Sequence, residues 1–205
     1  MSRVELPQHW PLAEGTDLRD DLRTAYDDPG RRYHGTRHLE EVLERLDELR
    51  RAGTEFEQLP VTLAAWFHDS VYDGERDAEE RSAAWAEDGL AGLVDAAVVA
   101  EVARLVRLTE THQPEDDDAN GCALSDADLA ILAAGAQRYA EYRAAIRDEY
   151  GHLDDADFRK GRAQVLKHLL EKDTVFHTPY ARDAWEALAR ANLEAELLEL
   201  AEGLQ

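Results

Sequence analysis

Apolar side chains recur at three- and four-residue spacing along most of this chain, and that spacing is the period of an amphipathic helix. The pattern is clearest in residues 36–52, where one stripe consists of Leu39, Val42, Leu43, Leu46 and Leu49. Residues 59–72, with the sequence LPVTLAAWFHDSVY, are apolar nearly all round and predict a central buried helix. No two segments alternate in the manner of paired strands. The sequence therefore predicts an all-α fold.

Further helices are predicted over residues 79–90, 94–108, 136–150, 154–171 and 179–201. The clearest loop is 113–121, which combines a proline, an acidic run and Asn-Gly. Ser125-x-x-Asp128 follows it before an apolar run and is similar to a capping box, so we expect a helix to start there. The loop is short and no repeat of 20 to 50 residues is visible, so residues 1–205 are predicted to form a single domain. The last helix is expected to pack on the bundle or on a second subunit.

Composition excludes several classes of protein. Hydrophobic residues make up 44% and charged residues 33% of the 205 positions, which is typical of a globular protein. No apolar run reaches the roughly 18 residues of a membrane span, and the N-terminus lacks a signal-peptide pattern, so we expect a cytoplasmic protein without a membrane partner. The net charge of −22 opposes binding of nucleic-acid polymers. It also opposes a small anionic substrate, unless a cation or an arginine cluster reverses the potential inside a cleft.

His68-Asp69 stands near the end of the most apolar helix. An ionised aspartate in such surroundings carries a desolvation cost unless it is paired or binds a metal. Neighbouring helical residues point about 100° apart, so both side chains can reach one ion beside the helix. The alternative is a helix cap, with Asp69 bonded to an arginine and His68 packed in the core.

His34 and His38 flank a predicted helix start, with Thr36 as the expected N-cap. His34 is then in the loop and His38 in the first turn, at the edge of the buried face. A zinc-protease HExxH pair is excluded because Gly35 occupies the glutamate position. The two histidines could also be polar capping groups.

Asp126 and Asp128 lie at the expected start of the next apolar helix. Aspartates in a first turn commonly satisfy free backbone N–H groups and the helix dipole. Because they are two residues apart, they point to nearly opposite sides, so one of them at most is expected to be a ligand. Together with His38, His68 and Asp69, they offer a nitrogen and oxygen donor set suited to one ion of Mn, Fe, Co, Ni or Zn, and less to Mg. The single cysteine, Cys122, excludes a cysteine-based zinc cluster.

The order HxxxH, then HD about 30 residues later, then an aspartate resembles the HD superfamily. The chain is most similar to uncharacterised bacterial HD phosphohydrolases with YHNxxHI, AAxFHDxVYD, NExxSA and DADLAIL stretches. The corresponding stretches here are 33–39, 64–73, 78–83 and 126–132, and the resemblance runs from about residue 15 to 200. Gly35 and Ala78 depart from the pattern, which prefers asparagine at both positions.

This resemblance implies a single-domain HD-type helical bundle that hydrolyses a phosphomonoester or phosphodiester, with a small nucleotide-like metabolite as substrate. It favours Asp128 as the fourth ligand. The YHNxxH stretch also resembles the start of the cyclic-nucleotide phosphodiesterase site, which implies His38 as a ligand and His34 as the acid that protonates the leaving oxygen. That pattern has a further histidine where Tyr72 stands, and its absence favours one firmly held ion. HD bundles often dimerise, so a homodimer is a further expectation by analogy.

In this interpretation Asp69 also accepts a hydrogen bond from the attacking water. The groups expected to bind substrate phosphate are Arg37, His112, Arg143 and Arg162, although each arginine could equally be a solvated helix residue. Two alternatives stay open. One is a non-catalytic HD bundle that binds a nucleotide or metal and signals through a partner. The other is a plain helical interaction protein.

Overall fold

The computed structural model describes residues 9–202, and the regular elements in that range are helices without strands. They are α1 (Thr16–Tyr26), α2 (Thr36–Arg51), α3 (Gln58–Phe67), α4 (Ala78–Leu90), α5 (Ala96–Leu108), α6 (Ala119–Leu129), the 3₁₀ helix η2 (Ala130–Ala133), α7 (Ala136–Glu149), α8 (Asp155–Glu171), α9 (Pro179–Ala184) and α10 (Glu186–Glu202). The predicted all-α fold is confirmed. None of the described helices has the length and apolar character needed to cross a membrane.

Helix α3 lies at the centre of the core. Val61 and all residues from 63 to 67 are fully buried, and the helix packs against α2, α4, α5 and α6. A helix surrounded by others has no polar face, which explains why this stretch is apolar nearly all round. The end of α3 therefore delivers the residues that follow it, His68 and Asp69, into the interior of the bundle.

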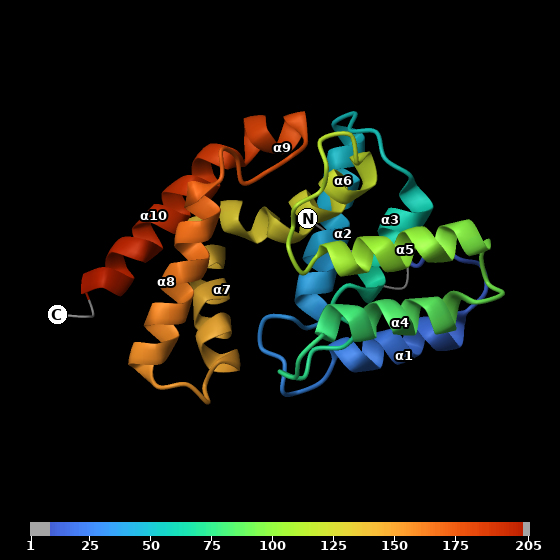
Figure 1. Cartoon of the computed structure of the whole chain (residues 1–205), viewed down its shortest axis with the longest axis horizontal. Coiled ribbons are helices and arrows are strands. Elements are labelled where there is room, and N and C mark those ends of the chain that lie inside the picture. The colour runs from blue at the N-terminus through green and yellow to red at the C-terminus, as the bar shows by residue number, and fades with distance from the viewer. Residues whose placement is uncertain (1–8, 203–205) are drawn as a thin grey trace.

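Helices α7, α8 and α10 form a second group beside the one made by α1 to α5 (Figure 1). Helix α6 and η2 lead from one group to the other (Figure 1). An ion pair between Arg162 of α8 and Glu196 of α10 connects the second group, with Nε and Oε1 2.8 Å apart. The hydroxyls of Tyr139 and Tyr142 on α7 join the same network. The three helices are thus joined by satisfied polar contacts as well as apolar packing.

Two element boundaries near the N-terminus differ from the prediction. Helix α1 was not predicted, although Leu18, Leu22 and Tyr26 recur at four-residue spacing and pack on the core. Helix α3 ends at Phe67 and not at Tyr72. Beyond that point the Asp69 N–H donates to the Tyr26 hydroxyl, and the Val71 N–H donates to the Ser82 hydroxyl. Tertiary partners have replaced the hydrogen bonds that would continue the helix.

Helix α6 begins earlier than predicted. Asp118 caps it by accepting a hydrogen bond from the Gly121 N–H at 2.9 Å, so Asn120 and Gly121 lie inside the helix and not in a loop. A Cβ on residue 121 would lie 2.6 Å from Leu108 Cδ2, so glycine is required by packing and not by a turn. The capping box predicted at Ser125 is wrong, and Asp128 lies in the last turn of the helix.

The predicted helix over 179–201 is two helices. Helix α9 ends at Ala184, and Trp185 adopts φ −115° and ψ −29° before α10 begins at Glu186. The Glu186 carboxylate accepts hydrogen bonds from the Val175 and Phe176 N–H groups. The start of α10 is thereby tied to the preceding loop, a contact that periodicity does not reveal.

Candidate metal centre

His38 reaches the interior from the first turn of α2. The helix begins at Thr36, with Gly35 as N-cap and not Thr36 as predicted. The Thr36 hydroxyl instead donates to Asp27. Leu39 and Val42 are buried against the core, and they set the rotation of the helix. His38 is left 2% exposed at the edge of that buried face, as the periodicity predicted.

His68 is oriented by the end of α3. Its Nδ1 lies 2.8 Å from the Ala65 carbonyl oxygen, which accepts hydrogen bonds but cannot donate them. Nδ1 therefore carries a hydrogen, and in the neutral ring, the form that binds a metal, Nε2 presents the lone pair. Metal-binding histidines are commonly oriented by such a bond on the nitrogen opposite the ligand atom.

The donor atoms of His38, His68 and Asp69 form a compact group where these elements meet, and Asp128 adjoins the two histidines. The Nε2 atoms of His38 and His68 are 3.0 Å apart, and Asp69 Oδ2 lies 3.4 Å from the first and 3.2 Å from the second. Asp128 Oδ1 lies 3.0 Å from His38 Nε2 and 3.7 Å from His68 Nε2. Ligands about 2.1 Å from a metal are separated by roughly 3.0 to 3.4 Å in octahedral or tetrahedral geometry. Four of the five separations fall in that range, and the one between Asp128 Oδ1 and His68 Nε2, 3.7 Å, is longer.

The electrostatics of the cluster favour a cation. Burial lowers the pKa of His38, but hydrogen bonds with Asp128 and Asp69 outweigh it and raise the pKa to about 10. Burial raises the pKa of Asp69, but the charge of His68 and a hydrogen bond with His38 hold it well below its usual value. The pKa of Asp128 is lowered by the same histidines, against the effect of burial. Both carboxylates are therefore ionised at neutral pH, and their negative charges favour a positive charge at the histidine nitrogens.

The two predicted aspartates of α6 separate as their spacing required. Asp128 joins the histidines, whereas the fully buried Asp126 accepts hydrogen bonds from the His177 and Thr178 N–H groups, each at 2.7 Å. Both oxygens of Asp126 are thus committed to the chain before α9. The structure gives Asp126 a structural position outside the ligand cluster, and the candidate fourth ligand is Asp128.

His34 lies beside the cluster, with its ring centroid 5.7 Å from that of His38. Its Nδ1 donates to Glu149 Oε2 at 2.7 Å, and its ring stacks on Tyr72 with centroids 4.1 Å apart. Because Nδ1 is engaged, Nε2 is the ring nitrogen available for another partner.

Glu149 was missed by the sequence reasoning. Its Oε1 accepts hydrogen bonds from the N–H groups of Arg32, Tyr33 and His34 at 2.7 to 3.0 Å. Although burial raises the pKa of this carboxyl, the hydrogen bond and charge of His34 outweigh it and lower the pKa to about 2. Glu149 lies 115 positions from His34 at the end of α7, and no local motif marks it.

Arg31 was also missed. Its guanidinium donates to the carbonyl oxygens of His34 at 3.2 Å, Asp69 at 2.6 Å and Ser70 at 2.9 Å. It therefore ties the loop that carries His34 to the segment that carries Asp69. No pattern in the sequence distinguishes it from the neighbouring arginine.

The arginines predicted to bind substrate have other partners. Arg37 is half exposed and pairs with Glu41 and Glu141 on the surface. Arg143 bonds to Glu199, and Arg162 belongs to the network described above. The structure gives no contact between these arginines and the four-donor cluster, and their pairing with carboxylates leaves them little capacity for a phosphate.

His112 does lie at the cluster. Its Nε2 is 3.6 Å from Asp128 Oδ2, and its backbone is in the left-handed region at φ 49°, which is unfavourable for a residue with a Cβ. Such backbone strain is held by surrounding structure and tends to occur at functional sites.

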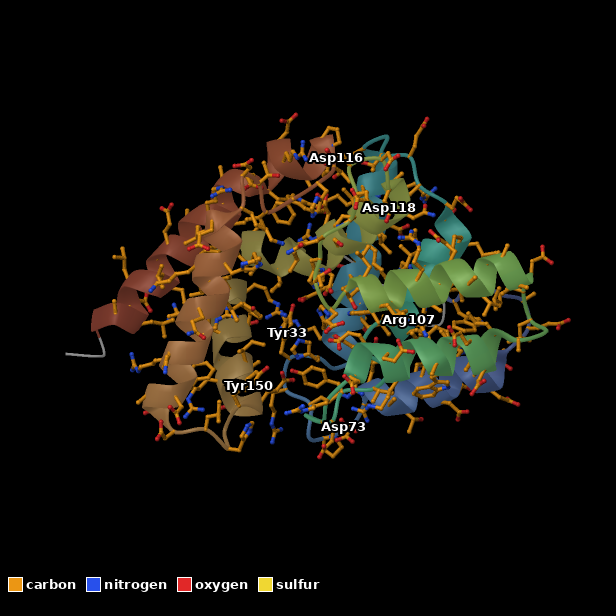
Figure 2. All side chains as sticks on the ribbon, in the orientation of Figure 1. Tyr33, Asp73, Arg107, Asp116, Asp118 and Tyr150 are labelled. Atoms are coloured by element: carbon orange, nitrogen blue, oxygen red, sulfur yellow. The ribbon has the colours of Figure 1, made fainter. Side chains whose placement is uncertain are left out.

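The cluster borders a cavity of about 120 Å³ whose wall includes Tyr33, His38, Asp128 and Arg138. Tyr33 lies between the two groups of helices (Figure 2). Comparisons with protein-family models, curated proteins and solved structures found no match to this chain.

Proposed function

We propose that this chain is a metal-dependent phosphohydrolase of the HD type, acting on a phosphate ester of a small, nucleotide-like metabolite. The observation that carries the proposal is the compact group of His38, His68 and Asp69 in the interior, with Asp128 of a third helical region against the two histidines. Without a metal ion, the two buried carboxylates pair with a protonated His38, whose pKa they raise to about 10, and a metal ion bound to the histidine nitrogen would replace that proton. The order of these residues along the chain is also that of the HD pattern.

The donor set fits a divalent transition ion, because two imidazole nitrogens and two carboxylate oxygens suit Mn, Fe, Co, Ni or Zn better than Mg. His38, His68, Asp69 and Asp128 would hold it, and the bond from His68 to Ala65 leaves the correct nitrogen free. When bound, such an ion supplies a Lewis acid that polarises a phosphoryl oxygen and lowers the pKa of water.

His34 is proposed as the acid that protonates the departing oxygen. Glu149 accepts the hydrogen bond from Nδ1, which leaves Nε2 as the ring nitrogen that would deliver the proton. Tyr72 limits rotation of the ring by stacking on it. Asp69, 17% exposed, is the least buried of the four donors described above and is proposed to orient the attacking water.

The test combines metal analysis with a substrate screen. Purified protein should contain about one transition ion per chain and should hydrolyse at least one compound of a phosphorylated-metabolite panel supplied with Mn, Co, Ni or Mg. His68→Ala should lose both the metal and the activity. The matched control is His168→Ala, because that histidine is exposed on α8 and should be dispensable.

Two outcomes would contradict the proposal in different ways. Full metal content in His68→Ala would refute the ligand assignment. Metal binding that depends on His68, without turnover of any compound in the panel, would favour the non-catalytic bundle that signals through a partner.

A further inference from the structure

A second cluster of nitrogen-bearing side chains lies beside the Asp128 edge of the metal centre. Lys172 Nζ donates to the His112 carbonyl oxygen at 3.4 Å, and the His112 ring contacts Asp128 as described above. His177 also lies close to His112, and the pKa of His177 is lowered by burial. Both His112 Nδ1 and His177 Nε2 are buried polar atoms without a hydrogen-bond partner in the described structure. Unpartnered polar atoms of this kind commonly mark a site for a ligand or water.

Lys172 differs from most basic residues of the chain. Within residues 9–202 it has no ion pair with a carboxylate, whereas Arg37, Arg143 and Arg162 all do. The side chain is half-buried, and burial lowers its pKa. A half-buried ammonium whose partner is a single long bond to a carbonyl has donors to spare for an anion.

The segment that carries Lys172 is held firmly in place. Arg190 donates to the carbonyl oxygens of Lys172 at 2.8 Å and Asp173 at 2.9 Å. The Glu186 carboxylate accepts from the N–H groups of residues 175 and 176, and the Asp126 carboxylate accepts from those of residues 177 and 178. This accounts for Asp126: it fixes the loop that brings His177 and Lys172 against His112. The strained backbone of His112 is stabilised from the same side.

Binding of a phosphate ester at this metal centre requires a positively charged protein group in addition to the metal ion. Two ligand carboxylates would neutralise a divalent ion, so an incoming phosphate would meet little net positive charge at the metal itself. The net charge of −22 repels it further. Arg31 is committed to three carbonyl oxygens, and the predicted arginines are paired elsewhere.

We propose that Lys172, together with His112, binds the phosphoryl group of the substrate at the Asp128 edge of the metal centre. This rests on the proposed function for the identity of the substrate, but phosphate binding itself is separable from turnover. The flexible lysine stem can swing from the His112 carbonyl toward the ligand, and its three donors suit phosphate oxygens. Lys172 thus takes the role that the sequence pattern assigned to Arg143 and Arg162.

The experiment is calorimetric titration of inorganic phosphate into Mn²⁺-loaded protein. Lys172→Gln should weaken phosphate binding by about 10- to 100-fold, the range expected for a lost charge-assisted hydrogen bond. Lys172→Arg should retain most of the affinity. The control is Lys167→Gln, an exposed lysine on α8, which should bind phosphate as the wild type does. Manganese affinity and the unfolding midpoint should be unchanged in all three variants.

With a substrate in hand, Lys172→Gln should raise KM by a similar factor and alter kcat much less. Wild-type affinity for phosphate in Lys172→Gln would overturn the inference while leaving the proposed function intact. Absence of phosphate binding by the loaded wild type would also overturn it. Lysine-dependent phosphate binding in a protein that hydrolyses no ester would support the anion site and refute the proposed function. A lowered unfolding midpoint in Lys172→Gln, with phosphate affinity unchanged, would make Lys172 merely structural.

Discussion

Asp126 and Asp128 are two residues apart on α6, and replacing each with asparagine should produce opposite results. In Asp126→Asn, the amide keeps one acceptor for the His177 and Thr178 N–H groups, but its NH₂ group faces the other N–H. One buried donor is then left unsatisfied, at a cost of about 1–3 kcal/mol, and the remaining bond loses its charge assistance, worth about 1 kcal/mol. The total is about 2–4 kcal/mol, or roughly 4–16 °C in unfolding midpoint for a chain of this size.

Asp128→Asn should instead remove the response to metal. An ion present at 100 times its Kd stabilises the folded state by about 2.7 kcal/mol, which raises the unfolding midpoint by roughly 5–10 °C. Wild type and Asp126→Asn should both show this rise when Mn²⁺ is added to chelator-treated protein. Asp128→Asn should not show it.

The assay is thermal unfolding followed by circular dichroism, with and without Mn²⁺, combined with metal analysis. Each variant is the control for the other, because the substitution is the same and the positions share a helix. A metal-dependent rise that persists in Asp128→Asn and disappears in Asp126→Asn would refute the ligand assignment. An unchanged midpoint for metal-free Asp126→Asn would refute the structural role of that carboxylate.

The remaining predictions concern the His34 and Glu149 pair. His34→Ala should keep its metal and lose about 10²- to 10⁴-fold in rate on esters with alkoxide leaving groups. The loss on p-nitrophenyl esters should be far smaller, because their leaving group needs little protonation. Equal losses on both substrates, measured by steady-state kinetics, would contradict the acid role. Glu149→Gln should cost about 3 kcal/mol in free energy of unfolding at pH 7, since the Glu149 pKa is lowered from 4.5 to about 2. A lowered pKa stabilises the fold above pH 4.5 and loses that effect as pH falls toward 2, so urea denaturation should show the gap between variant and wild type closing over that interval; a gap independent of pH would exclude ionisation as the cause.

Some of the fold and the candidate site could be read from local pattern. The stripe from Leu39 to Leu49 predicted α2 and the inward position of His38, because helical period alone decides which residues share a face. The apolar stretch before His68 predicted a buried helix, and burial of an ionisable pair pointed to a cation. The two-residue spacing of Asp126 and Asp128 predicted that they would point apart.

Other features depended on contacts between distant segments. Helix α6 starts more than one helical turn before the expected capping box at Ser125. Asp118 caps it there, and Gly121 leaves room for Leu108 of α5. Glu149 joined the site across 115 positions. The hydroxyls of Tyr26 and Ser82 accept from the Asp69 and Val71 N–H groups, which a longer α3 would have used.

The sequence by itself thus determined the helical class and the residue types of the candidate centre, since both follow from short-range periodicity and from the chemistry of single side chains. Only the tertiary structure decided that Asp128 meets the histidines and Asp126 does not. It also decided that the predicted arginines are occupied and that Lys172 has no carboxylate partner in the described structure. Those outcomes depend on which hydrogen-bond partners and counter-charges packing brings within about 3 Å, and no local spacing specifies that.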